Sequence, residues 1–182
     1  MQLMSLATRL LIGGLFVGHG TQKLKGWFGG PGLENTSGWM ASMDMHPGRR
    51  NALAAGVTET AGGAMLALGL GTPVAAAALT GTMITAIRKV HLANGPWNAS
   101  GGYEYNAVLI AAALVIAEQG PGPISLDALL GTERKGTGWA LAALVLGAAA
   151  STATIEAGRR NAPPAPVTAD TAADAAEAAP VS

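Results

Sequence analysis

The sequence contains no cysteine, little charge and few aromatic side chains. The lack of cysteine excludes disulfide bonds, a thiolate nucleophile, and zinc or iron–sulfur sites built from thiolates. Charged residues make up 12% of the chain, about half of their share in a typical soluble domain. Because 11 Lys and Arg balance 11 Asp and Glu, the basic surface of a general nucleic-acid binder is also missing.

Long uncharged segments take the place of the missing charge. No Lys, Arg, Asp or Glu occurs in segments 10–22, 60–87, 105–117 and 136–155. Segment 60–87 is too long for one helix and is broken near Pro73, which suits a first helical position with Thr72 as the cap before it. A bilayer core needs about 20 helical residues. The pattern therefore predicts five spans, over 3–23, 51–70, 73–90, 103–119 and 136–155.

These spans predict an all-α integral membrane bundle. Residues 1–130 would form a four-helix antiparallel core, and residues 131–157 an additional transmembrane helix. Residues 158–182 are rich in Ala, Pro and Thr and carry few groups to bury, so we expect a disordered acidic tail.

The polar loop 24–50 has a pattern of its own. Asn35, Thr36 and Ser37 could cap a short helix that ends near Met45. Trp39 and its apolar neighbours Met40 and Met43 would share one face of it. This pattern fits an interfacial helix and a loop with a few apolar contacts equally well.

Lys and Arg are concentrated in alternate loops. One side of the membrane would hold Lys23, Lys25, Arg49, Arg50, Arg88, Lys89, Arg159 and Arg160. Arg134 and Lys135 fall on the other side, and Arg9 lies towards it. The positive-inside rule then places the first loop, the third loop and the C-terminal tail in the cytoplasm, and the N-terminus outside. The alternative is that some of these charges serve a site and carry no topological signal.

Glu59 lies well inside the predicted second span. A carboxylate at this depth is unfavourable by roughly 2.5–3.5 kcal/mol, so it should be protonated or paired. Gly56, Gly62 and Gly63 lie one turn away and would let another helix approach. We therefore expect Glu59 to face the bundle, either as a proton-carrying or ligand-contacting acid or as a neutral cross-helix contact.

Two further groups of polar residues adjoin the spans. His19, Gln22 and Lys23 are neighbours on one face of the first helix, with His19 suited to proton exchange. The second group follows the third span and opens the fourth, and it comprises Arg88, His91, Asn94, Tyr103 and Glu104. Both groups should converge at one membrane face. The structural alternatives are a snorkelling Lys23, an Arg88–Glu104 ion pair and an aromatic belt.

The histidines do not predict a metal site. His19, His46 and His91 include no pair at ligand spacing on a helix. His19, His91 and Glu59 could form a two-histidine, one-carboxylate set, but nothing in their spacing requires it. We therefore expect no metal ligands.

Several motifs resemble those of the DoxX family, in the same order along the chain. They are GHGTQKLKGWFGGPG at 18–32, ETAGG at 59–63, VHLANG at 90–95, GYEY at 102–105 and GPGPISLD at 120–127. The resemblance covers about residues 3–130. It implies a small multi-pass bacterial inner-membrane protein with a four-helix core, associated with redox and oxidative-stress systems. The fifth span and the acidic tail depart from the family pattern.

The resemblance favours an accessory or quinone-interacting subunit of a membrane oxidoreductase system, with other redox subunits as partners. His19 or Glu59 would exchange the proton, Lys23 or Arg88 would bond a quinone oxygen, and Tyr103 would wall the pocket. An independent enzyme is less expected, because no motif supplies an electron-carrying cofactor. The alternatives are a small-molecule or proton-coupled transporter and a membrane scaffold without catalysis.

Overall fold

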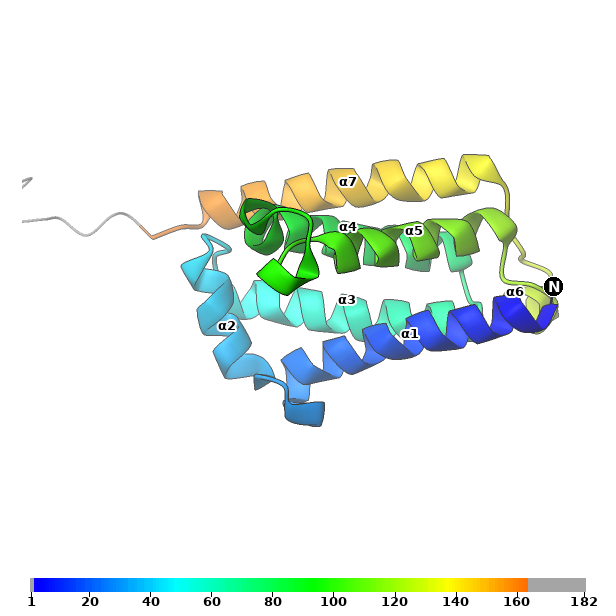
Figure 1. Cartoon of the computed structure of the whole chain (residues 1–182), viewed down its shortest axis with the longest axis horizontal. Coiled ribbons are helices and arrows are strands. Elements are labelled where there is room, and N and C mark those ends of the chain that lie inside the picture. Colours follow the sequence, from blue (N-terminus) through cyan, green and yellow to red (C-terminus); the bar gives the residue numbers. More distant parts are fainter. Residues whose placement is uncertain (1, 164–182) are drawn as a thin grey trace, which may run out of the picture.

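The computed structural model describes residues 2–163, and within that range every regular element is helical (Figure 1). The helices are α1 (Gln2–Lys25), α2 (Gly32–Ser42), α3 (Gly48–Leu68), α4 (Thr72–Ala86), α5 (Glu104–Gln119), α6 (Leu126–Leu130) and α7 (Thr137–Arg160). The π turn Ile87–His91 continues α4. The predicted all-α class is therefore confirmed.

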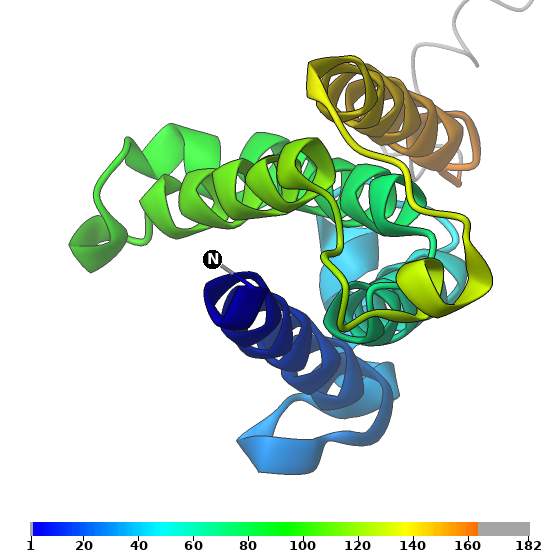
Figure 2. The ribbon, with the colours of Figure 1, turned by 90° about the vertical axis from the view of Figure 1, so that its right-hand side faces the viewer.

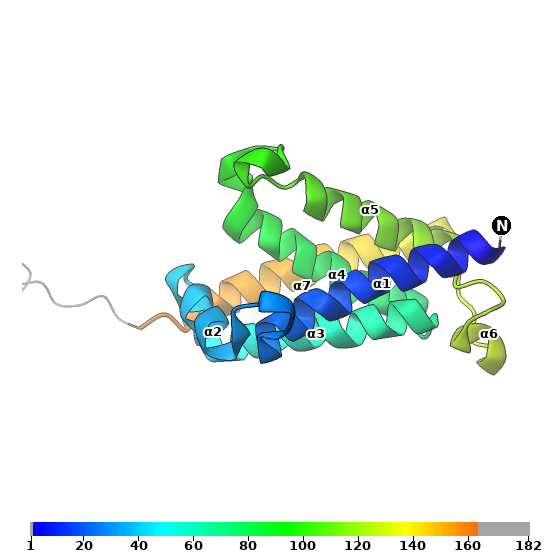
Figure 3. The same cartoon turned by 60° about the horizontal axis from the view of Figure 1, so that its bottom comes forward.

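α1, α3 and α7 run lengthwise through the bundle, α4 and α5 are inclined to them, and α2 lies across one end (Figure 1 and Figure 3). α1 packs mainly on α3, α3 also packs on α4, and α4 packs on α5 and α7 (Figure 2). The middle of the bundle is filled by a buried cluster that includes Phe16, Leu66, Leu79 and Ile116. α7 is thus an integral part of the helix packing.

Glycine sets the spacing between α1 and α3. A Cβ atom on Gly20 would lie 2.6 Å from the Gly56 carbonyl oxygen, and one on Gly63 would lie 2.6 Å from that of Gly13. Real side chains do not approach backbone so closely, and such small residues let helices pack tightly in membranes. The α1–α3 contact is therefore close along most of its length.

The predicted break between α3 and α4 is present, but its cap differs from the prediction. Gly69 and Gly71 both adopt left-handed backbone conformations, and α4 begins at Thr72. The Asp127 carboxylate accepts hydrogen bonds from the backbone N–H groups of Gly71 (2.8 Å) and Thr72 (3.1 Å). The group that caps the N-terminus of α4 is thus the Asp127 carboxylate of α6. Thr72, predicted to be the cap, donates its own N–H to that carboxylate.

Arg9 does not behave as a loop charge. Its side chain is buried at the same end of the bundle as Asp127 and donates to the carbonyl oxygens of Ala67 (3.1 Å) and Ile124 (2.5 Å). These bonds join α1, the end of α3 and the segment before α6. Arg9 therefore holds helices together. Arg134 and Lys135 are then the basic residues at this end that count in the positive-inside rule.

α2 also begins earlier than predicted. It starts at Gly32, and Thr36 lies inside the helix, where its hydroxyl donates to the Gly32 carbonyl oxygen. Thr36 is buried, so it packs α2 onto the bundle and does not cap it. At the other end of the chain, α7 runs to Arg160, three residues into the predicted tail, and residues 164–182 lie outside the described range.

Two of the helices, α1 and α7, are long and apolar enough to cross a membrane by length and composition. Both leave large apolar side chains exposed, including Leu11 on α1 and Val145 on α7. Soluble monomers seldom expose such continuous apolar faces. α3, α4 and α5 occupy the other three predicted spans as helices, and of the helices within residues 2–163 only α1 and α7 combine this length with this apolar composition.

Candidate functional site

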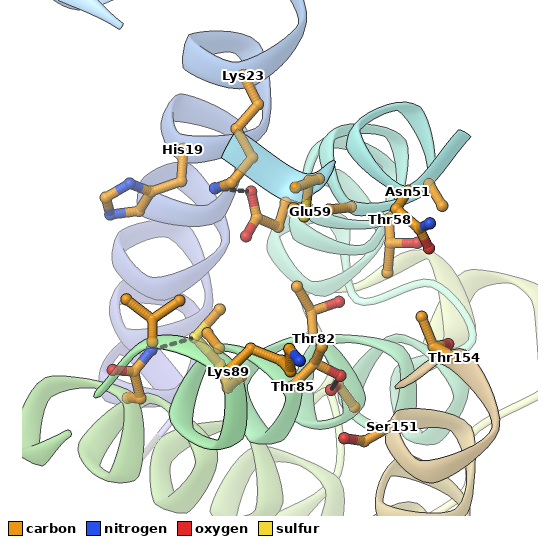
Figure 4. A pocket seen from close by; sticks show the side chains of 18 of the residues that line it. His19, Lys23, Asn51, Thr58, Glu59, Thr82, Thr85, Lys89, Ser151 and Thr154 are labelled. Carbon is orange, nitrogen blue, oxygen red and sulfur yellow. Dashed lines mark hydrogen bonds and ion pairs between the residues drawn. The ribbon is translucent and has the colours of Figure 1, made fainter. Parts of the chain in front are cut away.

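A cavity of about 650 Å³ lies at the end of the bundle that α2 crosses (Figure 4). Six helices contribute to its wall: the C-terminal ends of α1, α4 and α7, the N-terminal parts of α3 and α5, and α2. Its size is within the usual range for small-molecule sites. The buried cluster in the middle of the bundle separates it from the end that holds Asp127.

The strongest polar feature of the cavity is an ion pair between Lys23 on α1 and Glu59 on α3. The Lys23 Nζ atom lies 2.6 Å from Glu59 Oε2, as Figure 4 shows. The Glu59 side chain is 2% exposed, and that of Lys23 is 21% exposed. Close α1–α3 packing at Gly20 and Gly56 brings the two side chains within reach. The expectation that Glu59 faces the bundle is confirmed.

His19 lies one turn before Lys23 on the same wall. Its Nδ1 atom is 3.1 Å from Gln22 Oε1, and its ring makes an edge contact with Tyr105 on α5 at a centroid distance of 6.3 Å. Gln22 in turn donates to the carbonyl oxygen of Phe28 at 3.4 Å. His19 therefore links the cavity to the outer face of α1, with one ring nitrogen not engaged by Gln22.

Hydroxyl groups line the opposite side of the cavity, between α4 and α7. Thr82 and Thr85 on α4 and Ser151 and Thr154 on α7 contribute to this wall, as does Lys89 in the π turn. Lys89 is half-buried and has no carboxylate at ion-pair distance among residues 2–163. The Thr82 and Thr85 hydroxyls already donate to the carbonyl oxygens of Ala78 and Gly81, so they offer acceptor oxygens to a ligand, and Lys89 adds one positive charge.

Sequence reasoning missed most of this wall. The unpredicted polar lining residues are Thr36, Asn51, Thr58, Thr82, Thr85, Lys89, Asn98, Tyr105, Asn106, Ser151 and Thr154. Threonine and serine are common in membrane helices, where each can bond the carbonyl oxygen one turn back, as Thr85 does with Gly81. The one available signal was the repeat of Thr at 82 and 85 near Lys89.

Only part of the predicted site meets at the cavity. His19, Gln22, Lys23, Glu59 and His91 line it. His91 uses its Nδ1 atom in a 2.7 Å contact with the carbonyl oxygen of Gly101.

The other four predicted residues do not line the cavity. Asn94 bonds the Gly101 carbonyl, and Glu104 accepts from the backbone N–H of Asn98 at 2.7 Å, so both hold the loop 92–103. Tyr103 is half-buried beside them. Arg88 donates to Thr152 at 3.0 Å, so the Arg88–Glu104 pair considered as a structural alternative does not form.

The described residues contain no group of three or more His, Cys, Asp or Glu side chains arranged to hold a metal ion. The hypothetical set of His19, His91 and Glu59 is therefore not assembled, since Glu59 is engaged by Lys23 and His91 by the loop.

The rest of the cavity wall is apolar and rich in methionine. Met40, Met43, Met45 and Met83 line it together with alanines of α3 and α4. Methionine side chains adapt to ligands of varied shape. The cavity can thus take an amphipathic molecule, with an apolar body against methionine and polar atoms towards Lys23, His19 or the hydroxyl wall.

Asp127 forms a second polar centre at the opposite end, outside the cavity. Burial raises the pKa of Asp127, but hydrogen bonds from the backbones of Thr72 and Gly71 and from the hydroxyls of Thr72 and Thr132 outweigh it. The pKa is therefore held below its ordinary value, and Asp127 stays ionised beside Arg9. This centre is structural, since its acceptor atoms are used in capping α4.

The comparisons with known proteins agree with the family motifs in the sequence. The DoxX family model matches residues 4–92, which extend from α1 through the π turn after α4. No curated protein and no solved structure matches the chain. The matched segment carries both members of the Lys23–Glu59 pair, and α1 lies within it almost entirely. Residues 4–92 therefore match the DoxX family of membrane proteins, and α1 within this segment is long and apolar enough to cross a bilayer.

Proposed function

We propose that this protein is a multi-pass accessory subunit of a membrane oxidoreductase system and that its cavity binds the headgroup of a quinone or quinol. The observation that carries the proposal is the Lys23–Glu59 pair in the wall of an otherwise largely apolar cavity. A charged pair inside a membrane bundle is unfavourable to maintain, and such groups are commonly functional.

The two members of the pair suit different parts of quinone chemistry. Quinone reduction adds protons at the carbonyl oxygens, and electrons would come from a partner subunit. Lys23 can donate a hydrogen bond to one quinone oxygen. Glu59 can give a proton to that oxygen or take one from it. His19 stands at the edge of the cavity, where its imidazole can donate or accept a hydrogen bond.

The membrane setting of the proposal uses the five helices α1, α3, α4, α5 and α7. α1 and α7 each contain 24 residues, about 36 Å of helix, which exceeds the bilayer core. α3, α4 with its π turn, and α5 would cross beside them. The basic residues gather at the cavity end, so the cavity would face the cytoplasmic side of the plasma membrane.

The test is mass spectrometry of small molecules extracted from protein purified in native lipid discs. The informative variant is Lys23→Met with Glu59→Gln, because removing both partners leaves no unpaired charge. The matched control is Glu118→Gln, the same change at an exposed residue on α5 at the other end of the bundle. We expect about one quinone per chain in the wild type and the control and a loss in the double variant. Equal quinone in all three would overturn the proposal.

A proton-coupled transporter is the second candidate. The hydroxyl wall between α4 and α7 favours it, because it extends the polar lining beyond the Lys23–Glu59 pair. Transport would require the end that holds Arg9 and Asp127 to open. Solute-driven proton flux in proteoliposomes, lost in Glu59→Gln and retained in Glu118→Gln, would favour this candidate over the first.

A further inference from the structure

The outer face of α1 carries a shallow groove that joins the cavity. The groove has a volume of about 440 Å³ and is lined along α1 by Leu10, Leu11, Gly14, Leu15 and Gly18. His19 and Gln22 line both the groove and the cavity. The two spaces therefore meet at His19, one turn before Lys23.

Helical periodicity explains the shape of the groove. Leu11, Leu15 and His19 are spaced by four residues, so they form a ridge that leads directly to Lys23. Gly14 and Gly18 follow the next row and leave a hollow beside this ridge. The hollow extends over about 12 Å of helix between Leu10 and Gly18.

Helix packing does not explain these two glycines. A Cβ atom added at Gly14 or at Gly18 would meet no atom within 4 Å. On the same helix, Gly13 and Gly20 face α3 and have no room for a Cβ. Glycine inside a helix is less favourable than alanine by roughly 1 kcal/mol, and at Gly14 and Gly18 no neighbouring helix requires it.

The geometry points to a ligand with one hydrocarbon tail, whose headgroup occupies the cavity and whose tail lies in the Gly14–Gly18 groove. This inference rests on the proposed function and specifies its ligand as a quinone that carries one hydrocarbon chain and enters from the bilayer along α1. The tail remains in the hydrocarbon region while the headgroup passes His19 to reach the Lys23–Glu59 pair. His19, Gln22 and Tyr105 surround this passage.

The groove is apolar except at its junction with the cavity. Gln22 and His19 bond each other there, and Gln22 also bonds the Phe28 carbonyl. An amphiphile in this position would have its polar part at the only polar section of the groove. The polar headgroup would meet the polar cavity and the apolar tail would meet the apolar groove. This match favours a tailed molecule over a compact apolar one.

The test compares two benzoquinones that share a headgroup, one with a single isoprene unit and one with a long prenyl chain. Binding is followed by quenching of tryptophan fluorescence, since Trp39 lines the cavity. The variants are Gly14→Leu and Gly18→Leu, whose Cβ atoms meet no neighbouring atom and whose side chains would occupy the groove, with a gain in helix propensity. The control is Gly138→Leu on α7, where an added side chain also meets open space.

We expect the long-chain quinone to bind about fivefold more weakly to each groove variant, which corresponds to about 1 kcal/mol. The short-chain quinone should bind the wild type and all variants alike, and Gly138→Leu should match the wild type with both probes. If the groove variants bind the long chain as the wild type does, the tail path is wrong and the headgroup site stands. If neither probe binds the wild type, the proposed function fails, and the tail path with it.

Discussion

At the residue scale, the Lys23–Glu59 pair has consequences for stability as well as for ligand binding. Lys23→Met leaves a carboxylate that is 2% exposed without its partner. Breaking a buried pair in this way is unfavourable by about 3 kcal/mol. We expect a lower thermal midpoint for Lys23→Met and recovery of most of the loss in Lys23→Met with Glu59→Gln, measured by thermal unfolding in detergent.

The interpretation would be contradicted if the double variant were less stable than Lys23→Met alone. That result would mean that each side chain stabilises the fold independently, through contacts other than the 2.6 Å pair. The same conclusion would follow if the loss of stability in the double variant equalled the sum of the losses in Lys23→Met and Glu59→Gln.

Asp127 gives a prediction about pH. Its pKa is lower in the folded protein than its ordinary value, so its contribution to stability is complete above that ordinary value. The contribution is lost as the pH falls through the folded-state pKa, because protonation removes the acceptor for Gly71 and Thr72. Asp127→Asn should lower the free energy of unfolding by about 2 kcal/mol at neutral pH.

The measurement is the thermal midpoint of wild type and Asp127→Asn between neutral and acidic pH. The difference between them should shrink as the pH falls below about 4. Glu34→Gln, at an exposed position on α2, is the matched control and should follow the wild type throughout. A constant difference between wild type and Asp127→Asn would contradict the capping role.

At the element scale, the α1–α3 contact can be tested with two glycines of the same helix. Gly20→Ala places a Cβ against Gly56 and Thr60 of α3, whereas Gly14→Ala meets open space. Overpacking of this kind is unfavourable by about 1–3 kcal/mol. We therefore expect Gly20→Ala to lower the thermal midpoint and Gly14→Ala to leave it unchanged or raise it.

Gly20→Ala should also affect the proposed binding site. Gly20→Ala would push α1 away from α3 and lengthen the Lys23–Glu59 contact, so quinone retention should fall with stability. A tolerated Gly20→Ala would mean that α1 and α3 are less closely packed than the structure has them.

The sequence was informative about helices and less so about their contacts. Uncharged segments located α1, α3, α4, α5 and α7, because apolar composition and glycine–proline breaks are local signals. The Asp127 cap was not predictable, since it joins positions 56 and 55 residues apart in the chain. The alternative of an Arg88–Glu104 pair does not form, because Arg88 lies in a π turn that rotates side chains relative to an α-helix and it contacts Ser151 and Thr152 on α7.

At the scale of the whole molecule, the absence of cysteine makes topology directly measurable. Single cysteines can be introduced at Gly38 in α2 and at Arg134 before α7, both exposed positions. Membrane-impermeant thiol reagents on intact cells should label Arg134→Cys and leave Gly38→Cys unlabelled until the membrane is permeabilised. The opposite pattern would invert the proposed orientation without changing the number of spans.

The closed end of the bundle also determines how occupants exchange. The cavity ends at the buried cluster around Phe16 and Leu79, and beyond it Arg9 and Asp127 fasten the helices together. Under the proposed function, oxidised and reduced quinone would therefore enter and leave by the same route, past His19. Quinol would then have to leave before the next quinone binds, so we expect quinol to compete with quinone for the cavity.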